Sequence, residues 1–145
     1  TTYVIETIRN FDVGTIKESK EIETTFENIN NDGENIGHGI ISFIVPPKGE
    51  NYFIANKPFV RFIGNKEKDS IETMMDNYGK GTATKTILAM NEFAKDKYGM
   101  SLYSGSTITE KGKEFFEKLT DQGLTEKVYF KDKYDSEKMN YRFII

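Results

Sequence analysis

The segment from Ala83 to Ala94 constrains the fold of this chain most, because its apolar residues recur with a helical period. These positions are spaced at four, three and four residues: Ala83, Ile87, Met90 and Ala94. Phe93 widens the apolar stripe, and the absence of Gly and Pro inside the segment means that helix propensity agrees with periodicity. The sequence therefore predicts an amphipathic helix that closes at Tyr98-Gly99.

Strands are predicted on both sides of this helix. Ser70–Met75 forms a short strand before it, and Met100 to Tyr103 returns as a strand after it. A strand–helix–strand unit usually gives a parallel pair of strands with a right-handed crossover. We therefore expect such a parallel unit within the sheet.

The first 30 residues are predicted to form one strand and one helix. Tyr3 to Ile8 carries β-branched residues and is typical of a strand. Ser19 can cap a following helix, and the turn residues 30–33 would end it. One face of that helix would carry Ile22, Phe26 and Ile29.

A meander of three strands is predicted next. Its first strand is Gly39 to Val45, closed by Pro46-Pro47, which cannot lie in a central ladder. The turn Lys48–Asn51 leads to the second strand, Tyr52 to Ile63, and a charged turn from Gly64 to Asp69 leads to the third, Ser70–Met75.

The end of the chain is predicted to contain a helix and two closing strands. Thr107 to Glu110 has the form of a capping box, so a helix should begin there. It presents Phe115, Phe116 and Leu119, and it should stop near Gly123 with Leu124 in a Schellman contact. The closing strands would be Lys127–Phe130 and Tyr141–Ile145. The whole order predicts a mixed α+β fold in one domain spanning residues 1–145.

The composition excludes several classes of protein and site. Hydrophobic residues make up 37% of the 145 residues and aromatic residues 13%, which is typical of a folded globular domain. No apolar run is long enough to cross a membrane and no leader precedes the first strand, so a cytoplasmic protein is expected. A net charge of −3 gives no general attraction for nucleic acid. With no Cys and a single His, no metal site is expected.

A glycine-rich turn, residues 77–83, opens the central helix. Backbone N–H groups at such a turn have no partner inside the helix, and the helix dipole adds positive potential. Gly79 and Gly81 allow close approach of an anion, and Lys80 adds a mobile charge. The alternative is that these glycines only make a tight turn before a packed helix. The string is neither a Walker motif nor a full dinucleotide-binding fingerprint.

The chain from Ser70 to Thr84 resembles the first signature of the GNAT superfamily of N-acetyltransferases. That signature is a strand with a Glu, an Arg/Gln-x-x-Gly-x-Gly/Ala loop and a long helix. Gly81 and Ala83 match the two small positions of the loop, with Gly79-Lys80 before them. Glu114–Leu119, which spells Glu-Phe-Phe-Glu-Lys-Leu, is similar to the second signature, a Phe-Tyr-Glu-Lys-Leu run on the next helix.

The resemblance implies a GNAT-like fold, with acetyl-CoA as the cofactor. Such a fold has a central mixed, mostly antiparallel twisted sheet, a parallel strand–helix–strand unit at its centre and flanking helices. The residues that would contact the cofactor are Met74, Met75, Tyr78, Gly79, Lys80, Gly81, Thr82, Ala83, Thr84, Thr109 and Phe116.

Three of these residues depart from the family pattern. Tyr78 stands where Arg or Gln is usual, and Thr109 stands where Asn is common. Phe116 replaces a Tyr that in many members protonates the departing CoA thiolate. The cofactor fold could therefore be kept while the catalytic detail differs or catalysis is lost.

The resemblance also implies which groups would catalyse acetyl transfer. An amine attacks the thioester, a base removes its proton, and a backbone N–H polarises the carbonyl. Glu72 falls where many members keep a catalytic Glu, although it could instead face solvent. Tyr103 could replace the missing proton donor, or it could simply pack in the core. His38, between Gly37 and Gly39, is expected to be a loop residue and not a general base.

Two functions follow as expectations. The first is an acetyl-CoA-dependent N-acetyltransferase that acts on an amine of an unidentified small molecule or protein. The second is a catalytically weak or inactive GNAT-like protein that binds a macromolecular partner, such as a phage-type inhibitor of a host factor. The last two strands could also pair with a second subunit to give a homodimer.

Overall fold

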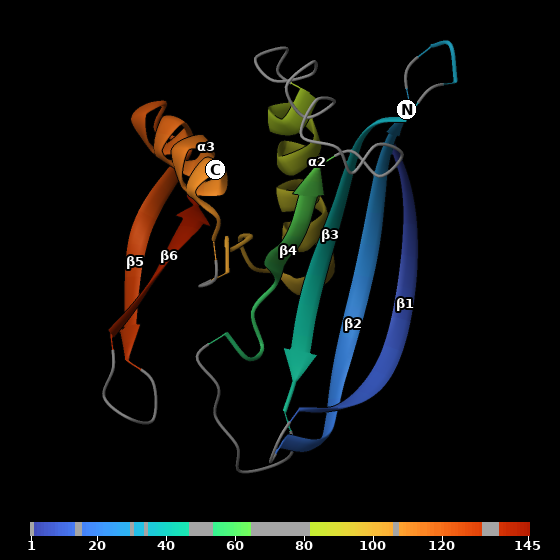
Figure 1. The fold of residues 1–145 in the computed structure, drawn as a ribbon, viewed down its shortest axis with the longest axis vertical. Coiled ribbons are helices and arrows are strands. Elements are labelled where there is room, and N and C mark those ends of the chain that lie inside the picture. The colour runs from blue at the N-terminus through green and yellow to red at the C-terminus, as the bar shows by residue number, and fades with distance from the viewer. Residues whose placement is uncertain are drawn as a thin grey trace.

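The computed structural model describes residues 2–13, 16–29, 31–33, 35–46, 54–64, 82–105, 108–131 and 137–145. Their elements are labelled in Figure 1 and follow one another in this order: β1 (Thr2–Val13), β2 (Ile16–Ile29), β3 (Asn35–Val45), β4 (Phe59–Gly64), α2 (Thr82–Tyr98), α3 (Glu110–Asp121), β5 (Thr125–Lys131) and β6 (Glu137–Phe143). The fold is mixed α+β, as the sequence predicts.

The first four strands form an antiparallel sheet in the order β1-β2-β3-β4. Residues 31–33 turn the chain between β2 and β3, and Gly33 adopts a φ of 81° there. The predicted strand Tyr3 to Ile8 lies inside β1, and Gly39 to Val45 lies inside β3. The third strand of the predicted meander, Ser70–Met75, lies outside the described residues, as do the turn Lys48–Asn51 and residues 65–69.

The helix predicted after Ser19 is wrong, because residues 16–29 form β2, which pairs with β1 on one side and β3 on the other. Ile22 and Phe26 are four residues apart, a spacing that fits one face of a helix and also one face of a strand. Thr24, which lies between them and is fully buried, supplies the alternation of a strand. The β-branched pair Thr24-Thr25 also favours extended backbone.

The strand predicted from Tyr52 is correct only at its end. Residues 54–57 form a turn in which Asn56 has a φ of 60°, and β4 begins at Phe59. Pro58 precedes it and has no N–H to give to a ladder. A register shift between β3 and β4 at Ile40/Ile41 marks an irregularity within β4.

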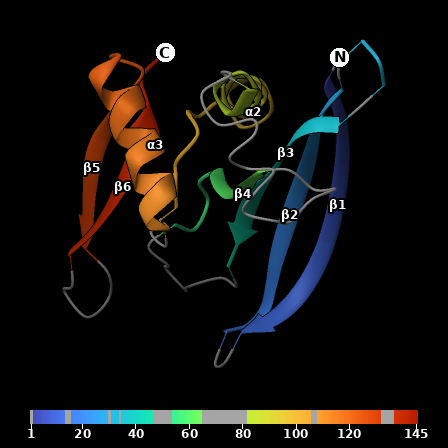
Figure 2. The same ribbon diagram turned by 45° about the horizontal axis from the view of Figure 1, so that its top comes forward.

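Helix α2 forms where the periodicity predicts it and covers one face of the four-stranded sheet. Phe93 meets Phe26 edge to face at 5.2 Å, and Tyr98 stacks on Phe43 at 4.3 Å between ring centroids. Gly99 follows with a φ of 67°, which suits a glycine after a helix. Figure 2 looks nearly along α2 and shows it between the sheet and α3.

The segment after α2 joins the four-stranded sheet to the hairpin β5–β6. Tyr103 pairs with Phe59 of β4 in parallel and with Arg142 of β6 in antiparallel orientation. Its N–H donates to the Pro58 carbonyl at 2.9 Å, and its own carbonyl accepts from the Val60 N–H at 2.8 Å. The predicted strand from Met100 is therefore reduced to isolated bridges at Tyr103. The bridge to Phe59 is parallel, but the first strand of the predicted strand–helix–strand unit, Ser70–Met75, lies outside the described residues, so that unit stays a prediction.

Helix α3 begins at Thr109, whose side chain accepts from the Gly112 N–H, and not at the predicted cap Thr107. It ends with the predicted Schellman pattern, because the Leu124 N–H donates to the Leu119 carbonyl and the Gly123 N–H to the Thr120 carbonyl. The hairpin that follows pairs Thr125 with Phe143 through Lys131 with Glu137. Its second strand therefore starts four residues before the predicted Tyr141 and ends at Phe143.

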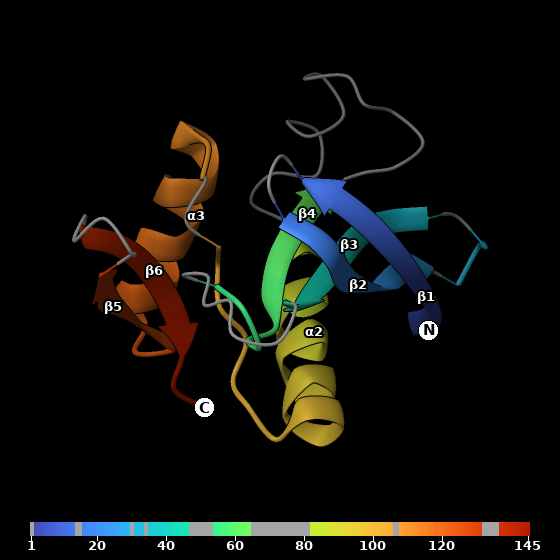
Figure 3. The same ribbon diagram turned by 90° about the horizontal axis from the view of Figure 1, so that it is seen from below.

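A single apolar core runs under both helices. Figure 3 shows α3 against the hairpin on one side of the molecule and the four-stranded sheet on the other. Leu102, which is fully buried, belongs to the same cluster as residues of α2 and α3. The fully or almost fully buried members of this cluster are Phe26, Ile41, Ile87, Met90, Ala94, Leu102, Phe116, Leu119, Tyr141 and Phe143. Both helices therefore cover the same face of the joined sheet.

One ionic contact ties α3 to the hairpin at the border of this core. The Tyr141 hydroxyl donates to Glu117 Oε1 at 2.6 Å, and Lys127 Nζ lies 2.9 Å from the same oxygen. The hydrogen bond from Tyr141, and then that from Lys127, holds the pKa of Glu117 below its ordinary value of 4.5. Burial, and then the hydrogen bond to Glu117, raises the pKa of Tyr141 above its usual range.

We predict that Glu117→Gln lowers the free energy of unfolding at pH 7 but has little effect at pH 3. The unfolded carboxyl gains its proton near the ordinary pKa of 4.5, whereas the folded carboxyl stays charged to lower pH. This stabilisation is therefore complete above that pH and is lost as the pH falls through the folded pKa. Urea denaturation at both pH values measures it, with Glu114→Gln on the exposed face of α3 as the control. If Glu117→Gln lowered the free energy of unfolding equally at pH 7 and pH 3, the stabilisation would not come from the charged Glu117 carboxylate.

Candidate functional site

Most of the predicted site residues lie outside the described part of the chain. Residues 65–81 are not described, and they include Glu72, Met74, Met75, Tyr78, Gly79, Lys80 and Gly81. Their roles as catalytic or cofactor-binding residues stay predictions. The described residues do place the two elements between which this segment runs, β4 and α2.

The predicted cofactor residues Thr82, Ala83 and Thr84 form the first turn of α2. Ala83 is exposed and Thr84 is half-buried. This turn contains no acidic residue, so no carboxylate of its own opposes an anion at the free N–H groups of the helix. The described turn therefore holds no acidic side chain that would oppose an anion.

The start of α2 lies near the carboxyl end of β4. Thr86 and Met90 of α2 lie against Gly39, which pairs with Ile63 near the end of β4. Tyr98, at the far end of the helix, stacks on Phe43. Ser42, next to Phe43, pairs with Phe59 at the start of β4. α2 therefore runs antiparallel to β4, and its free N–H groups lie beyond the strand's carboxyl end, where α/β crossovers usually bind ligands.

The parallel pairing between β4 and the Tyr103 segment is brief. Gly105 follows Tyr103 with a φ of 86°, and a Cβ there would lie 3.3 Å from the Val60 carbonyl oxygen. Among the described residues, no strand pairs with β4 from Arg61 to Gly64 on the side away from β3. Among the described residues, the pairing between β4 and this segment is therefore limited to the bridge between Phe59 and Tyr103.

Tyr103 lies at the centre of a row of paired residues that crosses the joined sheet on the face without helices. Directly opposed positions of neighbouring strands share a face. From β2 to β5 this row consists of Glu23, Ser42, Phe59, Tyr103, Arg142 and Glu126. Ser42 and Tyr103 follow Ile41 and Leu102, both of which belong to the core under the helices. The polar row is therefore on the opposite face.

Tyr103 is 8% exposed and packs against an aromatic and a cationic neighbour. Its ring lies 6.0 Å from that of Phe130, over which Lys57 Nζ sits at 5.4 Å. Its side chain hydrogen-bonds Arg142, which also pairs with Glu126. These two hydrogen bonds, that with Tyr103 first, raise the pKa of Arg142. A buried hydroxyl beside a permanent cation can hold or donate a proton to a group that gains negative charge.

A second polar cluster on the same face was not predicted from the sequence. Glu21 is 5% exposed and accepts from Ser42 Oγ at 2.9 Å and from Arg61 Nη1 at 2.6 Å. Arg61 also pairs with Glu23. Only when residues 16–29 are recognised as a strand do Glu21 and Glu23 fall on one face. The incorrect helical interpretation therefore concealed the cluster.

His38 is not a loop residue, contrary to the sequence prediction. It lies in β3, pairs with Glu27 and Gly64, and is 5% exposed. Its ring meets that of Phe62 edge to face at 5.5 Å. The flanking glycines Gly37 and Gly39 do not form a turn, because both lie in β3 and pair with β2. Met90 lies so close to Gly39 that a larger side chain there would collide with it.

The two predicted cofactor residues of the second signature serve structural roles. Thr109 caps α3, and Phe116 is 3% exposed in the core, where it stacks on Tyr141 at 5.2 Å. Their predicted contacts with a cofactor are not tested by this arrangement. Phe116 nevertheless offers no hydroxyl, so Tyr103 stays the predicted replacement for the proton donor.

Neither a metal site nor a membrane-crossing helix is found in the described ranges. No group of three or more His, Cys, Asp or Glu residues there is arranged to hold a metal ion. No described helix is both long enough and apolar enough to span a bilayer. Comparison with protein-family models, curated protein sequences and solved structures gives no match to this chain.

We predict that Glu21→Gln destabilises the protein by about 1–3 kcal/mol, because it removes the buried charge that Arg61 and Ser42 satisfy. Urea denaturation at pH 7 measures the change. Glu92→Gln on the exposed side of α2 is the control and should have no effect. If the two variants were equally stable, the buried cluster would not support the register of β2, β3 and β4.

Proposed function

We propose that this protein is an acetyl-CoA-dependent N-acetyltransferase of the GNAT type. The observation that supports it best is the parallel bridge between Phe59 of β4 and Tyr103, which follows α2, together with the start of α2 beyond the carboxyl end of β4. In a GNAT-type enzyme, the amine attacks the acetyl thioester beside a split in the sheet. The sequence resemblance at Ser70–Thr84 and Glu114–Leu119 supplies the second argument.

The first turn of α2 and the preceding glycine turn would hold the pyrophosphate. Gly79, Gly81 and the free N–H groups around Ala83 allow close approach, and Lys80 contributes a positive charge. Bound acetyl-CoA would supply an activated thioester carbonyl. The edge of β4 from Arg61 to Gly64, with which no described strand pairs on the side away from β3, would offer backbone groups along the route to Tyr103.

Two residues of the chain would then each transfer a proton. The acceptor amine forms a bond to the acetyl carbon as the carbon–sulfur bond breaks, so the nitrogen loses a proton and the sulfur leaves with the electron pair. Glu72, directly or through water, would take the proton from nitrogen. Tyr103 would give a proton to the departing thiolate, and Arg142 would stabilise the negative charge left on its oxygen.

We predict that Ala83→Glu weakens acetyl-CoA binding by about tenfold or more, because like charges a few ångströms apart near a protein surface repel strongly. A glutamate in a helix's first turn favours the helix itself, so folding should be unharmed. Isothermal titration calorimetry measures the affinity. Lys111→Glu places the same carboxylate in the first turn of α3 and should leave binding unchanged.

If wild type shows no acetyl-CoA binding, the enzyme proposal is overturned. If Ala83→Glu binds as tightly as wild type, the cofactor does not use the start of α2.

We predict that Tyr103→Phe lowers kcat by about 10²-fold, the usual contribution of a positioned proton donor, with KM for acetyl-CoA unchanged. The ring, and with it the packing against Phe130, is retained. Thiol release followed with a disulfide reagent measures turnover for an amine acceptor. The control is Tyr129→Phe, since Tyr129 is 61% exposed on the other face of the hairpin. Equal loss in both variants would remove Tyr103 from the mechanism.

A second candidate function is a GNAT-like protein that binds a macromolecular partner without turnover. The burial of Phe116 at the position of the family's usual tyrosine favours it, because that side chain supplies no proton. Acetyl-CoA binding with no thiol release across primary amines, and with no effect of Glu72→Gln, would support this candidate over the enzyme.

A further inference from the structure

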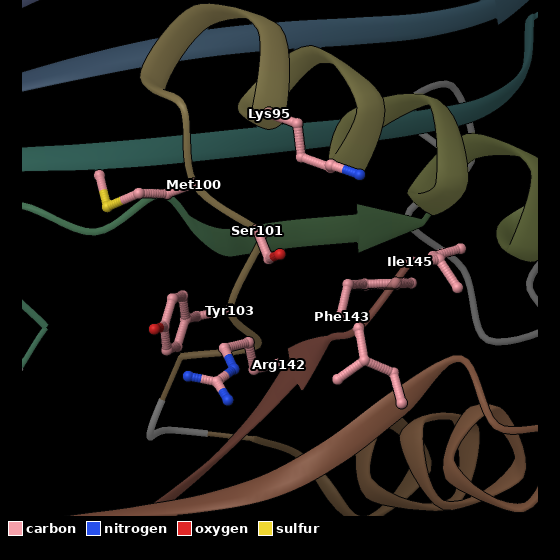
Figure 4. A pocket seen from close by; sticks show the side chains of 8 residues that line it. Lys95, Met100, Ser101, Tyr103, Arg142, Phe143 and Ile145 are labelled. Atoms are coloured by element: carbon pink, nitrogen blue, oxygen red, sulfur yellow. The ribbon is translucent and has the colours of Figure 1, made fainter.

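A cavity of about 430 Å³ lies at the end of α2 opposite to its first turn. It is formed by the last turns of the helix, the segment that follows them, and the end of β6. Figure 4 shows its side chains. The lining residues are Lys95, Met100, Ser101, Tyr103, Arg142, Phe143, Ile144 and Ile145.

The polar groups of this cavity suit an anion. Among the lining residues that the structure describes, two side chains are charged, those of Lys95 and Arg142, and both are cationic. Ser101 and Tyr103 add hydroxyls, and Figure 4 shows Tyr103 beside Arg142 with Lys95 across from them. Arg142 has five N–H donors, of which the bonds to Tyr103 and Glu126 leave several for a ligand.

The remaining lining is apolar and includes exposed side chains. Met100 and Phe143 form part of the wall, while Ile144 and Ile145 are 50% and 46% exposed. Aliphatic side chains so exposed can lose contact with water when a ligand covers them. An apolar wall next to two cations is the usual make-up of a site that takes an anionic head and an apolar body.

The walls of the cavity are held in place by one buried side chain. Asn91 of α2 is 3% exposed, and its Oδ1 accepts from the Leu102 N–H at 3.0 Å. Its Nδ2 donates to the Ile145 carbonyl at 3.3 Å. The helix, the segment after it and the end of β6 are therefore fixed to one another. A site built in this way needs little ordering when it binds a ligand.

We propose that this cavity binds a small organic carboxylate with an apolar body. The carboxylate would bind the Arg142 guanidinium beside the Ser101 and Tyr103 hydroxyls, Lys95 would add positive potential from the helix side, and the body would cover Met100, Phe143 and Ile144. The cavity shares Tyr103 and Arg142 with the catalytic residues proposed above, but it is distinct from the start of α2, because a helix of 17 residues separates the two by about 25 Å. The proposal stands on the cavity alone and does not depend on acetyl transfer.

The test is titration of the ¹⁵N-labelled protein with hexanoate, followed by NMR. Hexanoate should produce saturable shifts confined to residues 95–103 and 142–145. Hexanol and hexylammonium, which share the apolar body, should bind at least about tenfold more weakly, since each lacks the charge-assisted hydrogen bonds.

Lys95→Met should weaken hexanoate binding by about fivefold to tenfold while keeping the length of the side chain. Arg142→Lys, which retains the charge but loses the planar fork, should weaken it by less. Lys111→Met on α3 is the control and should bind as wild type does. Equal affinity for hexanol and hexanoate, shifts that map elsewhere, or unchanged binding in Lys95→Met would each overturn the proposal.

Discussion

The backbone pairing of residues 102–104 is the interaction on which the rest of the structure depends. On one side Tyr103 bonds to Pro58 and Val60, and on the other Ser104 and Leu102 bond to Tyr141 and Phe143. Ser104 Oγ also accepts from the Tyr141 N–H at 3.0 Å, which satisfies a strand group that the main chain leaves unpaired. Without this short segment, the hairpin β5–β6 and the four-stranded sheet would have no hydrogen bonds to each other in the described part of the chain.

Successive side chains of this segment point to opposite faces of the joined sheet. Leu102 points into the core shared by α2 and α3, so both helices pack on one side. Tyr103, one residue later, points to the other side and joins a row of polar groups with Arg142 and Glu126. The candidate chemistry therefore lies on the face that the described helices leave uncovered, and the apolar burial that stabilises the fold lies on the opposite face.

Sequence reasoning worked best where a periodic pattern and an end signal agreed. The helix 82–98 and its closing Gly99, and the Schellman end at Gly123 and Leu124, are in the structure as predicted. It failed where one spacing fits both a helix and a strand, as with Ile22 and Phe26. It also failed where a glycine makes room for a neighbouring side chain and does not form a turn. Gly39 makes room for Met90, so His38 is buried in a strand and not exposed in a turn.

The sequence by itself determined the central helix and the mixed α+β class, because these follow from local periodicity and helix propensity. Only the tertiary structure decided that Glu21, Ser42 and Arg61 meet, that Tyr103 lies between two sheets, and that Lys95 and Arg142 share a cavity. Those residues are far apart along the chain. Their proximity depends on strand register, which is set by the burial of a whole face and not by any local pattern.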